Sequence, residues 1–221
     1  MSATSDPTRR ALIAGAAAAA VAACAPAATE AQPAAPALVT VLGDSLTSGY
    51  GLSTAEALPA QLQAALVRSG VRATVRSVAR AGDTTADGLR KVDQVPAGSR
   101  VVVVALGGND LLQGLPFAQT RSNLDAIVRR LQARGFRVVL AGMQAPLELG
   151  AFARSFGALF AEVARERRVD AFYPFLLQGV ALDPRYNQRD RIHPNAAGAR
   201  IIAERLAPVV AGVLRSRARA A

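Results

Sequence analysis

The sequence is poor in the side chains that hold disulfides and metals. Its 221 residues include one cysteine, Cys24, and one histidine, His193. A single cysteine excludes a disulfide within the chain. One thiol and one imidazole give no ligand spacing typical of a zinc or other transition-metal site, so we expect neither a metal nor a cofactor. Any chemistry that needs an imidazole must therefore use His193.

Lysine is also scarce, and Lys91 is the only one, so the formal net charge of +10 comes almost entirely from arginine. The arginines are scattered through segments with helical spacing, apart from a small group in the last residues of the chain, Arg215, Arg217 and Arg219. No basic stretch is interleaved with aromatic residues, as a nucleic-acid-binding strand would be. We expect a solvated, arginine-rich surface and no nucleic-acid partner.

The first residues differ in composition from the rest. Arg9 and Arg10 precede an apolar segment, 11–24, that is too short to cross a bilayer. This pattern predicts a secretory signal peptide over 1–23, with an arginine pair that fits the twin-arginine type. The letters "VAAC" at 21–24 resemble the bacterial lipoprotein cleavage box, in which Cys24 would carry lipid and attach the protein to a membrane. The alternative is an ordinary leader that is cut later, around Ala31.

The remainder is predicted to be one globular domain, because 51% of the residues are hydrophobic and only 19% are charged. An Ala/Pro-rich linker at 24–37 precedes the domain at 38–215, and a basic tail follows at 216–221. The leader predicts export to the periplasm or cell envelope.

Apolar runs alternate with helical patterns along this domain. Strands are predicted at 38–43, 72–78, 100–107, 136–143 and 169–174, and helices at 55–69, 85–92, 117–134, 151–168 and 195–214. Continuous apolar strands separated by helices are typical of an α/β fold with a parallel sheet covered on both faces. Gly135 stands where the third helix should end. Ligands bind such sheets at the carboxyl ends of the strands, so the loops there are the place to seek a site.

Two of the loops between the predicted strands and helices carry a serine and a histidine that could act together. Ser45 follows the first strand in "GDS", where it is either a nucleophile or the cap of the next helix. Asp190 lies three residues before His193, an offset from which a carboxylate reaches the Nδ1–H of the ring and leaves Nε2 for a serine. A lone histidine is more often structural, but this arrangement favours catalysis by Ser45, His193 and Asp190.

A nucleophile of this kind needs donors for an oxyanion. Gly82 could present its backbone N–H from a turn, and Asn109 in "GGND" carries a neutral NH₂ donor. The alternatives are an ordinary turn glycine and a helix cap. Asp44 and Asp110 are interpreted as acceptors that brace their loops. Neither the dinucleotide pattern G-x-G-x-x-G nor the esterase pattern G-x-S-x-G is present.

Together, four ordered motifs resemble the blocks of the SGNH (GDSL) hydrolases: "GDSL" with Ser45, "AGDTT" with Gly82, "GGND" with Asn109, and "DRIHPN" with Asp190 and His193. The wider text is most similar to the bacterial thioesterase I, lysophospholipase and arylesterase group. The resemblance implies a three-layer α/β/α, flavodoxin-like fold, a serine hydrolase acting on acyl esters or thioesters, and an oxyanion hole of Ser45, Gly82 and Asn109. The sequence departs from the usual pattern of this family at Arg80 and in "APLELG" at 145–150, and we expect both places to touch the rim of the pocket.

The substrate is less well indicated than the chemistry. Leu112, Leu115 and Phe117 follow Asn109 closely and are candidate contacts for an acyl chain, although they could instead pack on the sheet. Phe152, Phe156 and Phe160 have the spacing of a core stripe on one helix. Two other functions stay open: a deacetylase of envelope polysaccharide with the same triad, and a lipid-anchored binding module without activity.

Overall fold

The computed structural model describes residues 35–216, which form an α/β domain around one sheet. The predicted leader, Cys24, most of the linker and the last five residues lie outside this range. The sheet consists of β1 (Ala37–Gly43), β2 (Ala73–Ala79), β3 (Ser99–Ala105), β4 (Arg137–Ala141) and β5 (Ala171–Tyr173). All pairs are parallel, in the order β2-β1-β3-β4-β5, which is the flavodoxin-like order. The predicted α/β class and five-stranded sheet are confirmed, and each strand lies within two residues of its predicted ends.

Burial on both faces explains why the central strands are almost purely apolar. The four valines of β3, Val101 to Val104, are fully buried, as are Val39, Val41 and Leu42 in β1. Helices cover a parallel sheet on both sides, so a polar side chain on a central strand would lose its water. The edge strand β2 has an open side and carries the exposed Arg76.

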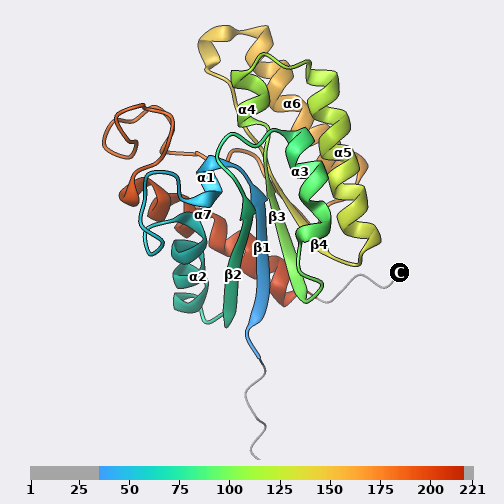
Figure 1. Cartoon of the computed structure of the whole chain (residues 1–221), viewed down its shortest axis with the longest axis vertical. Coiled ribbons are helices and arrows are strands. Elements are labelled where there is room, and N and C mark those ends of the chain that lie inside the picture. The colour runs from blue at the N-terminus through green and yellow to red at the C-terminus, as the bar shows by residue number, and fades with distance from the viewer. Residues whose placement is uncertain (1–34, 217–221) are drawn as a thin grey trace, which may run out of the picture. The chain divides into compact units, whose positions relative to one another are not determined.

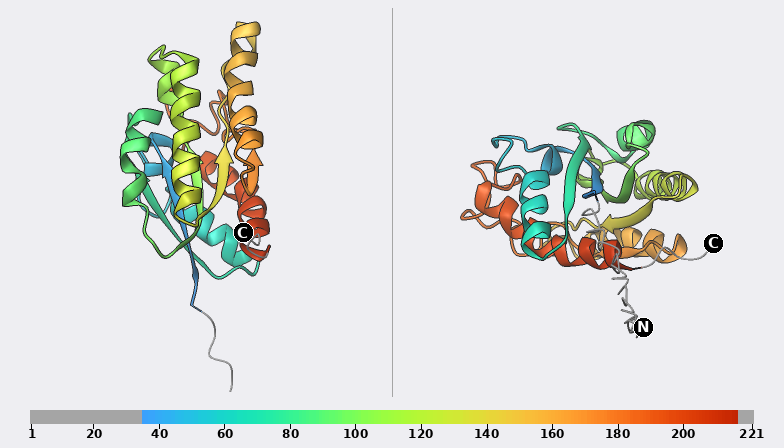
Figure 2. Two further views of the ribbon diagram at one scale, coloured as in Figure 1. Left: turned by 90° about the vertical axis from the view of Figure 1, so that its right-hand side faces the viewer. Right: turned by 90° about the horizontal axis from the view of Figure 1, so that it is seen from below.

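Helices form the two outer layers. On one face α2 (Leu58–Arg68) packs against α7 (Ala196–Arg215), and on the other α3 (Thr85–Lys91) packs against α5 (Phe117–Ala133), as Figures 1 and 2 show. The fifth long helix, α6 (Ala151–Glu166), lies beside α5 and contacts β4 and β5. All five helices were predicted within three residues of their ends. The domain is thus the expected three-layer α/β/α sandwich.

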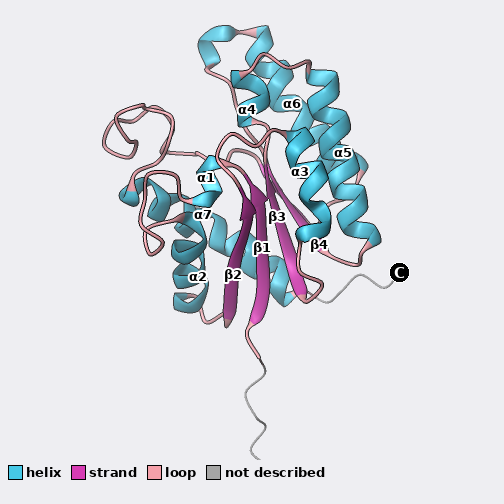
Figure 3. Cartoon of the chain, in the orientation of Figure 1, coloured by secondary structure: helices cyan, strands magenta, loops and turns pink. Residues whose placement is uncertain are grey.

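Two very short helices were not predicted, α1 (Ser45–Ser48) and α4 (Gly108–Leu112), and each begins just beyond the carboxyl end of a strand (Figure 3). Two short 3₁₀ turns were also not predicted, η1 (Val92–Gln94) and η2 (Leu147–Leu149). One turn of helix cannot display a 3.6-residue hydrophobic period, which is why the pattern did not reveal them.

Two further predictions have different outcomes. Gly135 follows the end of α5 with φ +80°, a left-handed conformation that suits glycine, so the predicted helix end is confirmed. The core stripe on α6 is partly wrong: Phe156 and Phe160 are fully buried, but Phe152 is 48% exposed. It lies in the first turn of α6, where its ring packs on Phe117 instead. Within residues 35–216, no helix is long and apolar enough to cross a membrane.

Candidate active site

The sheet register brings the predicted site residues together. Gly43 at the end of β1 is level with Ala79 at the end of β2 and with Ala105 at the end of β3. The loops that carry Ser45, Gly82 and Asn109 therefore leave three neighbouring strands at the same height. Residues separated by more than sixty positions in the chain meet at one edge of the sheet.

A sharp turn places Ser45 at the start of α1. A Cβ on Gly43 would lie 2.2 Å from Thr47 Oγ1 and 2.9 Å from the Ala105 carbonyl oxygen, so only glycine allows this close turn. The cap of α1 is Asp44, whose Oδ1 accepts a hydrogen bond from the Leu46 N–H at 3.0 Å. The interpretation of Ser45 as a helix cap is therefore wrong, and its hydroxyl is left for another partner.

That partner is His193. The Ser45 Oγ lies 2.9 Å from Nε2 of His193, and Nδ1 of the same ring lies 2.7 Å from Oδ2 of Asp190. The other oxygen of Asp190 accepts hydrogen bonds from the backbone N–H groups of His193, at 3.0 Å, and Ile192, at 2.9 Å. These hydrogen bonds, led by the one from the His193 N–H, lower the pKa of Asp190 to about 2. Asp190 is thus a carboxylate at neutral pH, able to hold the imidazole in one orientation.

Two residues that the sequence analysis did not single out support the histidine. The Tyr50 ring packs on the His193 ring with centroids 4.6 Å apart and planes inclined at 42°. Nε2 of Gln188 donates to the carbonyl oxygens of Tyr50, at 2.8 Å, and Pro194, at 3.0 Å. This amide joins the segment after α1 to the loop before α7. Their places beside the "GDSL" and "DRIHPN" motifs were the only signal in the sequence.

A hydrogen bond joins the turn of Gly82 to the side chain of Asn109, the two candidate oxyanion donors. Gly82 has φ +87°, and its turn is closed by hydrogen bonds from the Arg80 N–H to Asp83 Oδ2, at 2.8 Å, and from the Asp83 N–H to the Arg80 carbonyl, at 3.1 Å. Nδ2 of Asn109 donates to the Asp83 carbonyl at 2.9 Å. Within residues 35–216, the backbone N–H groups of Ser45 and Gly82 donate no hydrogen bond. These two N–H groups can therefore donate to a ligand.

Asn109 is not a helix cap. It lies inside α4, and the N-cap position belongs to Gly107. Its Nδ2 is also 3.4 Å from Oδ2 of Asp44, so the side-chain amide spans the space between the serine turn and the glycine turn. The cap interpretation of Asn109 is therefore wrong.

Asp44 and Asp110 brace the loops, as predicted. Asp110 is fully buried and accepts hydrogen bonds from the N–H and Oγ1 of Thr85 and from Oγ1 of Thr120. Asp44 is also buried, and burial raises its pKa to about 7. Neither carboxylate contacts His193 by a hydrogen bond.

A pocket of about 720 Å³ opens at these groups. Ser45, Gly82, Asn109 and His193 line it, together with mostly apolar side chains such as Leu46, Leu111, Met143, Phe175 and Leu177. The segment with the unusual sequence "APLELG" contributes Ala145 to Glu148 to its wall, and Arg80 adjoins the lining residue Ala81. The departure at 145–150 thus lies at the pocket, as predicted, whereas Arg80 is not among the residues that line it.

The candidate acyl contacts separate into two groups. Leu112 lines the pocket with Ser45, but Leu115 and Phe117 line a smaller pocket of about 380 Å³ together with Phe152. The prediction that all three line the pocket of Ser45 is wrong, because the backbone turns at Gly114, with φ +65°, and carries Leu115 and Phe117 away from it. Within residues 35–216 no three His, Cys, Asp or Glu side chains are grouped so as to hold a metal ion.

Comparison with known proteins shows the family of the chain. The chain is 33% identical to the esterase TesA of Pseudomonas aeruginosa over 82% of this chain and 91% of that protein. It is 32% identical to thioesterase 1/protease 1/lysophospholipase L1 of Escherichia coli K12, over 79% and 83%. The solved structure of AlinE4, an SGNH-hydrolase family esterase, matches with a TM-score of 0.68 at 36% identity, over 84% of this chain and all of that one. Residues 41–201 also match the model of the GDSL-like lipase/acylhydrolase family, and the chain therefore belongs to that family of serine hydrolases.

Proposed function

We propose that the protein is a serine esterase that cleaves acyl esters through Ser45, His193 and Asp190. The observation that carries this proposal is the hydrogen-bonded series from Asp190 Oδ2 through the His193 ring to Ser45 Oγ, with distances of 2.7 and 2.9 Å, whose serine and histidine line an apolar pocket. In such a series the carboxylate fixes the tautomer of the imidazole, and the imidazole activates the hydroxyl.

The reaction has two halves. Ser45 Oγ forms a bond to the carbonyl carbon of the ester while Nε2 of His193 takes the hydroxyl proton. The tetrahedral intermediate collapses, the bond from carbon to the alcohol oxygen breaks, and His193 gives its proton to the departing alcohol. Water then repeats the sequence on the acyl-enzyme, with His193 again as base, and releases the acid and free Ser45.

The negative charge on the carbonyl oxygen develops between the two turns described above. The N–H groups of Ser45 and Gly82 and the amide of Asn109 are the donors that we assign to it. All three are neutral, so they stabilise the oxyanion without transferring a proton to it. Asp190 stabilises the imidazolium that forms at the same time.

The pocket favours an acyl chain over a small polar group. Its lining is mainly aliphatic and aromatic, whereas an acetyl group on a polysaccharide needs only a small cavity beside an open, polar surface. Relatives are named as an esterase, an arylesterase and a thioesterase/lysophospholipase. The same site chemistry would cleave esters and thioesters.

A chain-length series of p-nitrophenyl esters tests the proposal. We expect turnover that rises from acetate to butyrate and octanoate. Turnover of acetate alone would favour the polysaccharide deacetylase. No turnover with any ester would favour a binding module without activity.

We also propose that the protein is exported and anchored to the cell envelope through Cys24. Arg9, Arg10 and the apolar segment 11–24 support this location, with "VAAC" as the cleavage box. An enzyme in the envelope meets many phospholipid and other esters and little acyl-CoA. We therefore favour esters over thioesters as its substrates in the cell.

A further inference from the structure

Exposed hydrophobic side chains gather around the pocket mouth. Of the eight large hydrophobic side chains exposed within residues 35–216, five line this pocket and form what we call the apolar rim: Tyr50, Leu112, Leu147, Leu182 and Ile192. They are between 44% and 78% exposed, so each presents apolar surface to solvent at the pocket. Two others, Leu149 and Phe152, continue the segment of Leu147, and only Val67 on α2 lies elsewhere. Such a gathering is uncommon on a surface exposed to water alone and marks a site of contact.

The charges beside the apolar rim are mainly positive. Arg189 and Arg191 are exposed on the loop before α7, and Arg80 is exposed on the turn of Gly82. Within the described residues none of these three guanidinium groups forms an ion pair, in contrast to Arg185, which is paired with Asp183.

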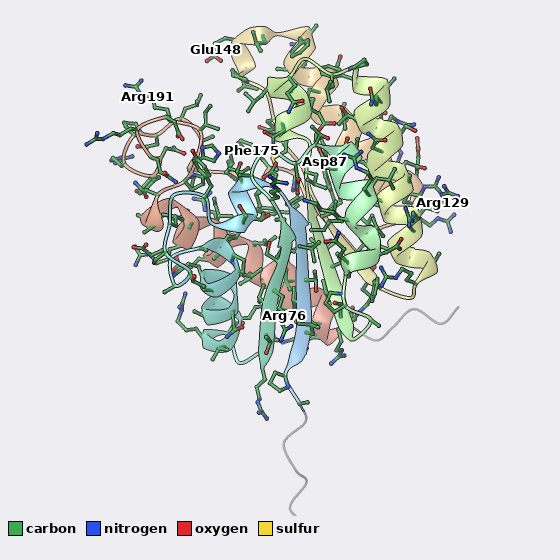
Figure 4. The ribbon with its side chains drawn as sticks, in the orientation of Figure 1. Arg76, Asp87, Arg129, Glu148, Phe175 and Arg191 are labelled. Carbon is green, nitrogen blue, oxygen red and sulfur yellow. The ribbon has the colours of Figure 1, made fainter. Side chains whose placement is uncertain are left out.

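Three carboxylates lie at or beside the same pocket. Asp44 lines it but is buried, Asp190 is hydrogen-bonded to His193, and Glu148 is exposed on η2. In Figure 4, Arg191 lies on the loop at the upper left and Glu148 at the top of the domain, with Phe175 below both. The mouth therefore has more unpaired positive than negative groups around an apolar ring.

We propose that the apolar rim and its arginines dock the enzyme on an anionic lipid surface, so that the pocket opens directly onto the acyl chains there. This proposal deepens the proposed ester hydrolysis and rests on it. Leucine and tyrosine side chains enter the boundary between headgroups and acyl chains, while arginines bind the anionic headgroups around them. A substrate could then pass from the lipid to Ser45 without crossing water.

Single-tryptophan reporters test this directly, because the chain contains no tryptophan. Leu147→Trp and Leu182→Trp place an indole on two different segments of the rim, η2 and the loop before α7, and both positions are more than half exposed, so little packing is lost. Val67→Trp, at a site 56% exposed on α2, is the matched control. All three are made in the full chain with Ser45→Ala, so that lipid is not consumed, and with Cys24→Ala, so that no attached lipid contributes.

The probe is a vesicle of phosphatidylcholine with or without phosphatidylglycerol. We expect the two rim indoles to shift to the blue and to be quenched by brominated acyl chains on vesicles with phosphatidylglycerol, while the indole at 67 does not respond. Replacing Arg189 and Arg191 by serine should weaken this binding about thirty-fold, from two charges near the surface. The control pair Arg76→Ser and Arg129→Ser, which lie away from the mouth in Figure 4, should not.

Four results would overturn the proposal. They are no shift at the rim, an equal shift at position 67, an undiminished shift on pure phosphatidylcholine, and a shift that grows with protein concentration without vesicles, which would mean that a second copy covers the rim. The wild-type enzyme is assayed in parallel on p-nitrophenyl butyrate without vesicles. Hydrolysis of p-nitrophenyl butyrate together with no fluorescence response of the rim indoles would refute the docking surface and leave the proposed function in place.

Discussion

Replacing Asn109 by alanine separates its proposed role in the transition state from a role in holding the fold. The Nδ2 of Asn109 donates at 2.9 Å to the Asp83 carbonyl and lies 3.4 Å from Asp44 Oδ2. The shorter contact uses one N–H well, and the longer one is weak. We infer that the second N–H turns to the oxyanion when it forms.

The expected magnitude follows from these two parts. Loss of one oxyanion donor should lower kcat by roughly 10²–10³, or about 3–4 kcal/mol, with KM nearly unchanged, because the donor acts only on the transition state. Loss of the hydrogen bond to Asp83 should lower the free energy of unfolding by about 1 kcal/mol. Asn109→Asp should reduce kcat further, because a carboxylate repels the oxyanion.

Steady-state kinetics on p-nitrophenyl butyrate and urea unfolding measure the two effects separately. The control is Asn123→Ala, since Nδ2 of Asn123 donates at 3.0 Å to Oγ1 of Thr85, outside the pocket. It should lose a similar amount of stability and keep its kcat. A rise in KM with kcat intact in Asn109→Ala would mean that Asn109 binds the substrate in its ground state and that another donor serves the oxyanion. Unfolding of the variant would make its role structural.

Three other predictions concern the triad, a buried carboxyl and the leader. Ser45→Ala and His193→Ala should each lower kcat by about 10⁴ or more with the fold intact, and EDTA should have no effect; a variant that keeps more than about one per cent of the activity would refute the mechanism. Burial raises the pKa of Asp44 from 3.8 to about 7, so the folded state prefers the protonated carboxyl. The stability that this preference contributes is complete below about pH 4 and is lost as the pH rises through about 7. The free energy of unfolding of Asp44→Asn, measured with urea and relative to the wild type, should therefore rise by about 3 kcal/mol from about pH 5 to about pH 8. The same difference between variant and wild type at both pH values would contradict a raised pKa. Mass spectrometry of membrane-extracted protein should find an N-terminus at Cys24 with an acylglyceryl group, whereas a soluble form that begins near Gln32 would indicate an ordinary leader.

The fold could be predicted from the sequence because its signals are local and repeated. Each central strand is an apolar run, because helices bury it on both faces. Each long helix has buried positions that recur with the helical period. The short helices α1 and α4 have no such period. They are set by where β1 and β3 end and by side chains such as Asp44 that cap them.

The residues of the site could be predicted for a different reason. One histidine in the chain left no choice for an imidazole, and the offset from Asp190 to His193 is short enough to be read along a single loop. Ser45 lies 148 residues from His193, and no spacing in the chain shows that they meet.

Sequence alone therefore indicated the layers, the order of the chemistry-bearing loops and the candidate nucleophile, base and orienting carboxylate, because these depend on residue type and near neighbours. Only the tertiary structure decided what lies beside them. It placed Tyr50 on the His193 ring, put Leu115 and Phe117 in a pocket of their own, and exposed Phe152 where a core residue was expected. The reason is physical: the shape of a pocket depends on how far loops from different strands extend past a common edge, and no local pattern of residues encodes that distance.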